Sequence, residues 1–199
     1  MTRIDHAVLT ADELVLRAPA DTDAEAALRM LSDPDVVQWM PADVHDLETA
    51  RGWCRRSADW DGHATFAIVD DGEALLGNVT LINIDLEQAT GEIGYRVAPW
   101  ARNRGVATKA LRAVTEWSFD ALTLRRIQLF HSVANPASCR VATKGAYQLE
   151  GTLRSAMVAG DGRRYDLHLH GRLSRVHGRL SHPHGPLSHV HGPLSHDEG

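Results

Sequence analysis

Apolar and polar residues follow two different periods along the N-terminal third of the chain. Residues 14–17 alternate apolar residues with polar neighbours, which is typical of a strand. Residues 24–31 follow a run of Asp and Thr that favours a helix start, and Asp33-Pro34 is expected to end this helix, because the residue before a proline avoids helical geometry. A second amphipathic helix is predicted over residues 46–60, where apolar residues lie along one side.

The rest of the chain contains further strand-like runs and two more helices. Asp70-Asp71-Gly72-Glu73 is a strong hairpin signal, and Asn135-Pro136 favours a helix start, with Asn as the cap and Pro in the first position. The strands are expected at residues 66–69, 75–82, 87–98, 126–133, 147–152 and 164–173, and the helices at residues 106–121 and from 135 onward. This pattern predicts an α/β (α+β) fold, in which a mixed, mostly antiparallel sheet of six to seven strands is flanked by about four helices.

A phosphate-binding loop is predicted between the strand at 87–98 and the helix at 106–121. The first N–H groups of a helix have no partner inside it and attract anions. Gly105 has no Cβ, so a phosphate can approach the backbone closely, and Arg102 and Arg104 would add charged donors. A solvated surface pair of arginines is the alternative, but the glycine and the helix start favour phosphate binding. The spacing matches neither a P-loop nor a dinucleotide-binding loop.

The same segment resembles the acyl-CoA pyrophosphate loop of the GNAT acetyltransferases, [RQ]-x-x-G-x-[GA], with Arg102, Gly105 and Ala107 in the defined positions. Residues 91–101 resemble the strand that precedes this loop in the ribosomal-protein N-acetyltransferase (RimJ/RimL-like) branch. Residues 135–151 resemble that branch's second signature, N-x-x-S-x-R-V-x-x-K-x-G-[FY]-x-x-E-G. The chain departs from this signature at one position, where Ala146 stands in place of the usual glycine. The resemblance covers roughly residues 10 to 172, most of the chain.

The resemblance implies a GNAT-like fold and an enzyme that uses acetyl-CoA as co-substrate. It implies direct attack by a primary amine in a ternary complex; the amine is a protein N-terminus, or a small amine such as a polyamine, an amino sugar or an antibiotic. The pantetheine arm would run along the strand at 87–98, which splays from the next strand. The expected cofactor-binding residues are Val97, Arg102, Asn103, Arg104, Gly105, Val106, Ala107, Thr108, Asn135 and Ser138. A non-catalytic acyl-CoA sensor is the alternative.

Two residues are candidates for proton transfer. Alternation places Glu92 on one strand face with Gly94 and Arg96, where its carboxylate could take a proton from the amine. An ordinary salt bridge of Glu92 to an arginine is an equal alternative, and water could remove the proton without a protein base. Ser138, three residues after Asn135, is expected to stabilise the leaving thiolate, as the RimJ/RimL-like signature implies. A local helix-capping hydroxyl is its rival interpretation.

Four nearby residues are interpreted as structural. Trp100 is expected to be a packing anchor at a strand end and Tyr147 a core residue, and His131 is expected to be a satisfied strand histidine rather than a base. Cys139 is expected to pack, with a covalent acyl-cysteine relay as the minor alternative. Substrate specificity is assigned to residues 33–62 and to the last hairpin. Since the first of these segments is acidic, it would steer a cationic amine towards the site.

Composition narrows the class of protein further. The chain has 199 residues and a formal net charge of −5, which argues against a dedicated nucleic-acid binder. Cys54 and Cys139 are far apart and form neither a disulfide framework nor a zinc motif, so no metal is expected. No apolar run approaches membrane-spanning length and no signal peptide is visible, which favours a cytoplasmic enzyme without a membrane partner. The oligomeric state, a homodimer included, stays open.

The C-terminal tail has a composition of its own. A seven-residue unit, His-Gly-[Arg/Pro]-Leu-Ser-x-x, occurs four times from His170 onward. Each unit contains one large apolar residue. The tail therefore offers too little apolar surface to offset the conformational entropy that it would lose on ordering. We therefore expect an acetyltransferase domain over residues 1–174 and a disordered His/Gly/Pro-rich tail over 175–199. Metal binding by the tail histidines is the less favoured alternative to an unselected repeat expansion.

Overall fold

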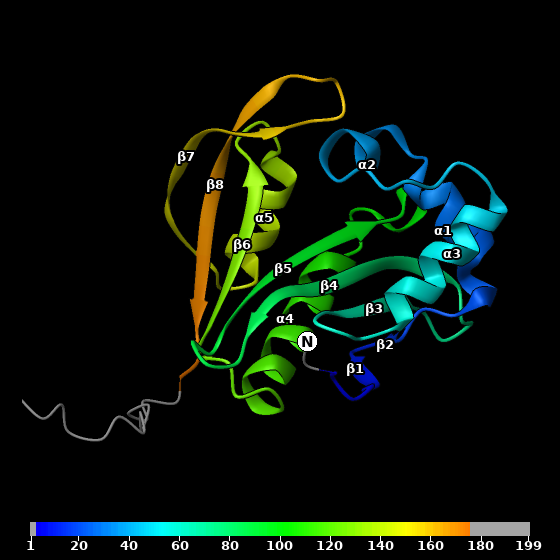
Figure 1. The fold of residues 1–199 in the computed structure, drawn as a ribbon, viewed down its shortest axis with the longest axis horizontal. Helices are drawn as coiled ribbons and strands as arrows, with labels where there is room; N and C mark the ends of the chain where they lie inside the picture. Colours follow the sequence, from blue (N-terminus) through cyan, green and yellow to red (C-terminus); the bar gives the residue numbers. More distant parts are fainter. Residues whose placement is uncertain (1–2, 176–199) are drawn as a thin grey trace, which may run out of the picture.

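The computed structural model describes residues 3–175, and the predicted tail from 176 onward lies outside this part of the chain. Within it, eight strands form one sheet in the order β1-β2-β3-β4-β5-β6-β8-β7, accompanied by five α-helices (Figure 1). The strands are β1 (Leu9–Ala11), β2 (Leu14–Arg17), β3 (Ala64–Val69), β4 (Leu75–Asp85), β5 (Thr90–Val97), β6 (Arg126–Ser132), β7 (Gln148–Val158) and β8 (Arg164–Leu173). The helices are α1 (Ala24–Leu31), α2 (Pro34–Trp39), α3 (Leu47–Ala58), α4 (Val106–Asp120) and α5 (Pro136–Lys144). The expectation of a mostly antiparallel mixed sheet is confirmed, with one more strand and one more helix than predicted.

The extra helix α2 begins where the sequence was expected only to end a helix. Asp33 is the N-cap of α2, and its carboxylate accepts hydrogen bonds from the backbone N–H groups of Asp35 and Val36. Pro34 occupies the first helical position, where its missing N–H costs nothing. The same dipeptide therefore ends α1 and starts α2. The extra strand β1 has only three residues and pairs with β2, too short a run to show a period.

The core lies on both faces of the sheet. Every residue of β3 is buried, so this strand is covered on each side. Helices α1 and α3 pack together and against β4 and β3 respectively, while α4 packs against β1, β2, β4 and β5. Trp117 packs edge to face on Trp60 and on Phe66 in this core, and Trp60 and Phe66 pack against each other at a tilt. Within residues 3–175, no helix combines the length and the apolar character needed to cross a membrane.

The sheet divides between β5 and β6. These two strands run parallel and pair only from Thr90 opposite Arg126 to Glu92 opposite Gln128. Beyond that point they diverge, and Figure 1 shows α5 lying alongside the separated part of β6. All other neighbouring strands pair antiparallel. The backbone edge of β5 after Glu92 is therefore left without a strand partner on the β6 side.

The β7–β8 hairpin reaches across this divide to α2 (Figure 1). The N–H of Gly160 donates to the carbonyl of Gln38 at 2.9 Å, and Trp39 packs edge to face on Tyr165 with ring centroids 5.4 Å apart. A Cβ atom at Gly160 would lie 2.5 Å from the Val37 carbonyl oxygen, so only glycine allows the two backbones to approach this closely. The hairpin and α2 together cover one end of the gap between β5 and β6.

The turn after α5 shows how the departure from the RimJ/RimL-like signature is accommodated. Ala146 has a φ of 64°, in the left-handed region that favours glycine. Its N–H donates to the carbonyl of Thr143, and the next N–H, of Tyr147, donates to the carbonyl of Ala142. The turn therefore keeps the backbone geometry that the usual glycine adopts freely, at a strain of about 1 kcal/mol.

Candidate active site

A cleft of about 820 Å³ occupies the space between the diverging strands β5 and β6. It is lined by both strands, by the start of α4, by α5, by α2 and by the β7–β8 hairpin. The predicted site residues that line it are Glu92, Val97, Arg102, Asn103, Gly105, Val106, Ala107, Thr108, Asn135 and Ser138. Arg104, also predicted to bind the cofactor, is exposed and is not among the lining residues. The fold thus gathers two distant segments of sequence, residues 92–108 and 135–138, on one cavity.

The predicted phosphate loop has the geometry of an anion-binding helix start. Gly105 is the N-cap of the 15-residue helix α4 and has a φ of 77°, which a residue with a Cβ rarely adopts. The first intrahelical bond runs from the N–H of Lys109 to the carbonyl of Gly105, at 3.1 Å. The N–H groups of Val106, Ala107 and Thr108 precede that bond and so have no acceptor within the helix. All three residues line the cleft.

The two arginines of the loop have different surroundings. The Arg102 guanidinium pairs with the carboxylate of Asp33 and, at 2.9 Å, with that of Asp35. These contacts fasten the loop to the start of α2, so this side chain is held by carboxylates rather than left free for a phosphate. Arg104 forms no ion pair with any of residues 3–175. Arg104 is therefore the loop cation that remains available to an anion.

Two further cations at the cleft were missed by sequence reasoning. Arg140 and Lys144 lie one turn apart on α5, both are exposed, and both line the cavity. Residues four apart share one helix face, so their spacing was a usable signal once α5 was predicted. They add positive charge along the same cavity that contains the start of α4.

The acidic segment at residues 33–62 does not form the predicted acidic rim. Asp33 and Asp35 are paired with Arg102, and Asp46 caps α3 through the backbone N–H of Thr49 at 2.8 Å. Of the segment's carboxylates, only that of Asp35 lines the cleft. Three of these carboxylates therefore cap helices or hold the loop at Arg102.

Glu92 lies at the point where β5 and β6 separate. Its Oε2 accepts a hydrogen bond from Nδ2 of Asn83 at 2.9 Å, and within residues 3–175 it forms no ion pair, which removes the salt-bridge interpretation. Asn83 sits at an irregularity in the β4–β5 register and has a φ of 50°. One carboxylate oxygen is thus held by an amide donor, while the residue faces the cavity.

Arg96 places a buried positive charge in the same cavity. Its Nε donates to the carbonyl of Met40 at 3.1 Å, and burial lowers the pKa of its guanidinium to about 10. The group still carries its charge at neutral pH. Because a like charge nearby disfavours a second cation, an amine that enters this cavity is favoured in its neutral, nucleophilic form.

The start of α5 separates the roles of Asn135 and Ser138. The Asn135 Oδ1 atom accepts from the backbone N–H of Ser138 at 3.1 Å, so Asn135 is the helix cap as predicted. The Ser138 hydroxyl takes no part in that cap, which removes its rival interpretation. Burial raises the pKa of the Tyr95 hydroxyl to about 12. The Ser138 hydroxyl lies close to the Tyr95 hydroxyl and opposes part of this rise. Tyr95 itself has no hydrogen-bond partner of proper geometry within residues 3–175.

The residues interpreted as structural have mixed outcomes. Tyr147 is buried as predicted and shares a hydrogen bond of 2.7 Å with the Thr115 hydroxyl. Trp100 is 38% exposed, and its indole N–H donates to the Leu75 carbonyl while the Arg29 guanidinium lies over its ring, so it anchors the strand end at the surface rather than in the core. His131 does hydrogen-bond the Ser132 carbonyl, but it also lines the cleft. Together with Cys139 it belongs to a side-chain cluster that the sequence did not indicate.

The chain is similar to proteins of known families. Residues 13–147 match the acetyltransferase (GNAT) domain family. The chain belongs to the GNAT acetyltransferases. It is 27% identical over 173 residues to the N-acetyltransferase YoaA of Bacillus subtilis, itself uncharacterized, covering 82% of this chain and 94% of that one. It is 29% identical over 112 residues to the ribosomal-protein-serine acetyltransferase of Escherichia coli, covering 56% and 62%.

The same fold occurs in a solved RimL structure. RimL, described as a ribosomal L7/L12 alpha-N-protein acetyltransferase in complex with coenzyme A, superposes with a TM-score of 0.76 at 19% identity, covering 84% of this chain and 98% of that one. The RimJ/RimL-like resemblance and the prediction of an acyl-CoA-dependent N-acetyltransferase are thereby confirmed.

Proposed function

We propose that this GNAT enzyme transfers the acetyl group of acetyl-CoA to a primary amine by direct attack in a ternary complex. The observation that carries the proposal is the cleft between β5 and β6, which contains a helix start with free N–H groups, a carboxylate and a hydroxyl. The coenzyme A complex of RimL, which shares the fold, supports this choice of co-substrate. We further propose a cytoplasmic location, which suits the two unpaired cysteines.

The cofactor has a complete path along the cleft. Its diphosphate is placed on the N–H groups of residues 105–108, with Arg104, Arg140 and Lys144 nearby as cations. The pantetheine amides pair with the edge of β5 after Glu92, where no strand occupies the β6 side. This path brings the thioester towards Glu92 and Ser138.

The chemistry then divides between two residues. The neutral amine attacks the thioester carbonyl carbon, and Glu92 takes the proton that the attacking nitrogen loses. When the carbon–sulfur bond breaks, the Ser138 hydroxyl gives a proton to the departing sulfur and recovers one from solvent, to which Glu92 releases the proton that it took. The buried charge of Arg96 favours the neutral form of the amine before attack.

Replacing Ser138 with alanine is expected to lower kcat about tenfold, less than most general acids contribute, because a thiolate is already a good leaving group. The KM for acetyl-CoA should change little, and the helix cap should survive, since Asn135 binds the backbone of residue 138. Steady-state kinetics with a thiol reagent measures both constants. Thr143→Ala removes another hydroxyl from the same helix and should leave kcat unaltered. An unaltered kcat in Ser138→Ala would remove this residue from the mechanism.

The cleft favours some acceptors over others. Its α2 and hairpin walls include Trp39, Met40, Met157 and Leu167, and its buried charge is positive. Apolar walls and a buried cation suit a protein N-terminus, whose amine is followed by peptide and side chains, better than a polycation such as a polyamine. The similarity of this chain to a ribosomal-protein-serine acetyltransferase supports the same class of acceptor. Amino sugars and amine antibiotics are the alternative acceptors.

An activity screen tests the proposal. Thiol release from acetyl-CoA is measured with N-terminal peptides, polyamines, amino sugars and aminoglycosides as acceptors. Turnover highest on peptides with free N-termini is expected, and blocking those termini should abolish it. Tight acetyl-CoA binding by calorimetry, with no thiol release on any amine, would instead establish a non-catalytic acyl-CoA sensor.

A further inference from the structure

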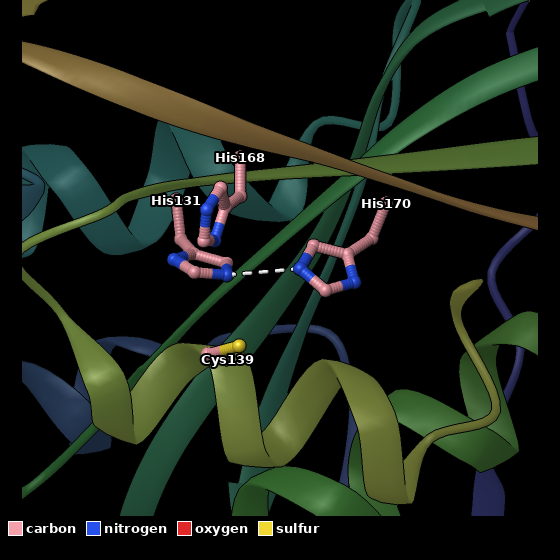
Figure 2. Close-up of side chains that lie close together, drawn as sticks. All are labelled: His131, Cys139, His168 and His170. Carbon is pink, nitrogen blue, oxygen red and sulfur yellow. Dashed lines mark hydrogen bonds between the residues drawn. The ribbon is translucent and has the colours of Figure 1, made fainter. Parts of the chain in front are cut away.

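Three histidines and one cysteine meet beside the cleft, outside the acetyl-transfer chemistry. His131 on β6 lies opposite His168 on β8 in the antiparallel register, and His170 is two residues further along β8 on the same face. Cys139 projects towards these three rings from α5 (Figure 2). One nitrogen or sulfur atom from each of the four residues lies within 4.8 Å of all the others. Two of the histidines, His131 and His170, are buried.

The hydrogen bonds of these rings determine which nitrogen atoms carry hydrogen. Nδ1 of His131 faces the Ser132 carbonyl at 2.8 Å, and Nδ1 of His170 faces the Tyr147 carbonyl at 3.4 Å. A carbonyl oxygen only accepts, so the short contact makes Nδ1 of His131 the donor and leaves its Nε2 with a lone pair in the neutral ring. The 3.4 Å contact of His170 is longer than a usual hydrogen bond and does not fix its tautomer. The two Nε2 atoms lie 3.1 Å apart (Figure 2, dashed line), a separation that suits either a hydrogen bond between the rings or two ligands of one cation.

His168 adds a further polar atom, without a partner among the described residues, to the cluster. Nδ1 of His168 is also buried and has no hydrogen-bond partner within residues 3–175. The cluster therefore contains an unsatisfied buried nitrogen and a close pair of ring nitrogens, in a group of four side chains whose ligand atoms converge.

We propose that His131, Cys139, His168 and His170 form a four-ligand site for Zn²⁺. In a tetrahedral site with usual bond lengths, ligand nitrogen atoms lie about 3.3 Å apart, and nitrogen and sulfur lie about 3.6 Å apart. The 3.1 Å pair is already close to this separation, and all four ligand atoms lie within 4.8 Å of one another. Histidine with thiolate is a ligand set that selects zinc over hard cations. The Ser132 and Tyr147 carbonyls would orient two of the rings from behind.

The site would be structural rather than catalytic. Four protein ligands leave no open position for water or substrate. The ion would tie α5 to the β6–β8 pair beside the place where the sheet divides, and Ser138 directly precedes one of its ligands. Binding is thus expected to stabilise the fold around the cleft without supplying a step of the transfer.

Cobalt absorption tests the proposal on the full-length chain. Co²⁺ bound by a thiolate gives a near-ultraviolet charge-transfer band, which the histidines that follow Arg175 cannot produce because no cysteine accompanies them. We expect the band in the reduced wild-type protein and its displacement by Zn²⁺. It should vanish in Cys139→Ser and persist in Cys54→Ala, since Cys54 is buried elsewhere and burial raises the pKa of its thiol to about 11. Replacing the histidines after Arg175 with alanine should leave the band in place.

Thermal unfolding provides the second measurement. A hundredfold excess of Zn²⁺ over its Kd should raise the Tm of the wild type by about 5 °C or more. His168→Gln and Cys139→Ser should reduce that shift and weaken Zn²⁺ binding at least tenfold, because even residues behind the ligands have effects of about this size. No thiolate band in the wild type, or equal loss of the band in Cys54→Ala, would overturn the proposal. A Zn²⁺-induced Tm shift that is unaltered in both ligand variants would overturn it as well.

Discussion

Replacing Glu92 with glutamine is expected to lower kcat on the order of 100- to 1,000-fold, the usual contribution of a general base. Glutamine has the same shape and can still accept the hydrogen bond from Asn83 through its amide oxygen, so the β4–β5 contact should be preserved. What is lost is the ability to take a proton from the attacking amine. Steady-state kinetics on the best acceptor of the screen measures the change, and circular dichroism verifies the fold.

The control for Glu92 is a glutamate outside the cleft. Glu87 is exposed in the β4–β5 turn, so Glu87→Gln removes the same charge without touching the cavity and should keep wild-type kcat. If Glu92→Gln retained full activity, water would be the proton acceptor and Glu92 a structural partner of Asn83. The proposal that the start of α4 binds the diphosphate would be unaffected, because the Gly105→Val variant tests it separately.

Replacing Gly105 with valine is expected to raise the KM for acetyl-CoA roughly 10- to 100-fold, as the loss of hydrogen bonds to a charged group implies. A Cβ at this position meets no protein atom closer than the Lys109 Cε at 3.9 Å. The added side chain therefore meets no core atom, and because Gly105 lines the cleft it would crowd the place proposed for the diphosphate. The KM for the amine should change far less, and equilibrium binding of coenzyme A provides an independent measurement.

Backbone strain needs a separate control, because Gly105 has a φ of 77°. Gly62 has a φ of 76°, has open space around its Cα, and lies outside the cleft lining. Gly62→Val thus imposes the same strain, about 1 to 2 kcal/mol, without touching the cofactor path. Comparable increases in the two KM values in Gly105→Val, or an equal defect in Gly62→Val, would count against diphosphate binding at this loop.

The cluster of three histidines and Cys139 depends on contacts that the sequence does not show. The separation of Cys54 and Cys139 in sequence speaks against zinc motifs whose ligands are close in sequence, and not against a site assembled from distant strands. Only the pairing of β6 with β8 brings His131 opposite His168, and only the packing of α5 adds Cys139. The sole local signal was the His-x-His spacing of residues 168 and 170, which places two rings on one face of a strand.

Arg102 illustrates the same point for charge. The sequence showed a cation beside a glycine and a helix start, and a phosphate donor was the natural interpretation. The fold brings α2 beside this loop, so that two carboxylates from residues 33 and 35 occupy the guanidinium. Carboxylates of the acidic segment thus pair with an arginine of the basic loop, and neither segment by itself predicts this contact.

The sequence by itself determined most helices and strands, the caps at Asn135 and Asp46, and the loop that begins α4, because each depends on residues within a few positions of one another. It also determined the family, through two motifs that flank one cleft. Only the tertiary structure decided where β5 and β6 part, which arginine is left free, and which histidines meet. Those outcomes depend on strand order and register, which pair residues far apart in the chain and leave no local period to read.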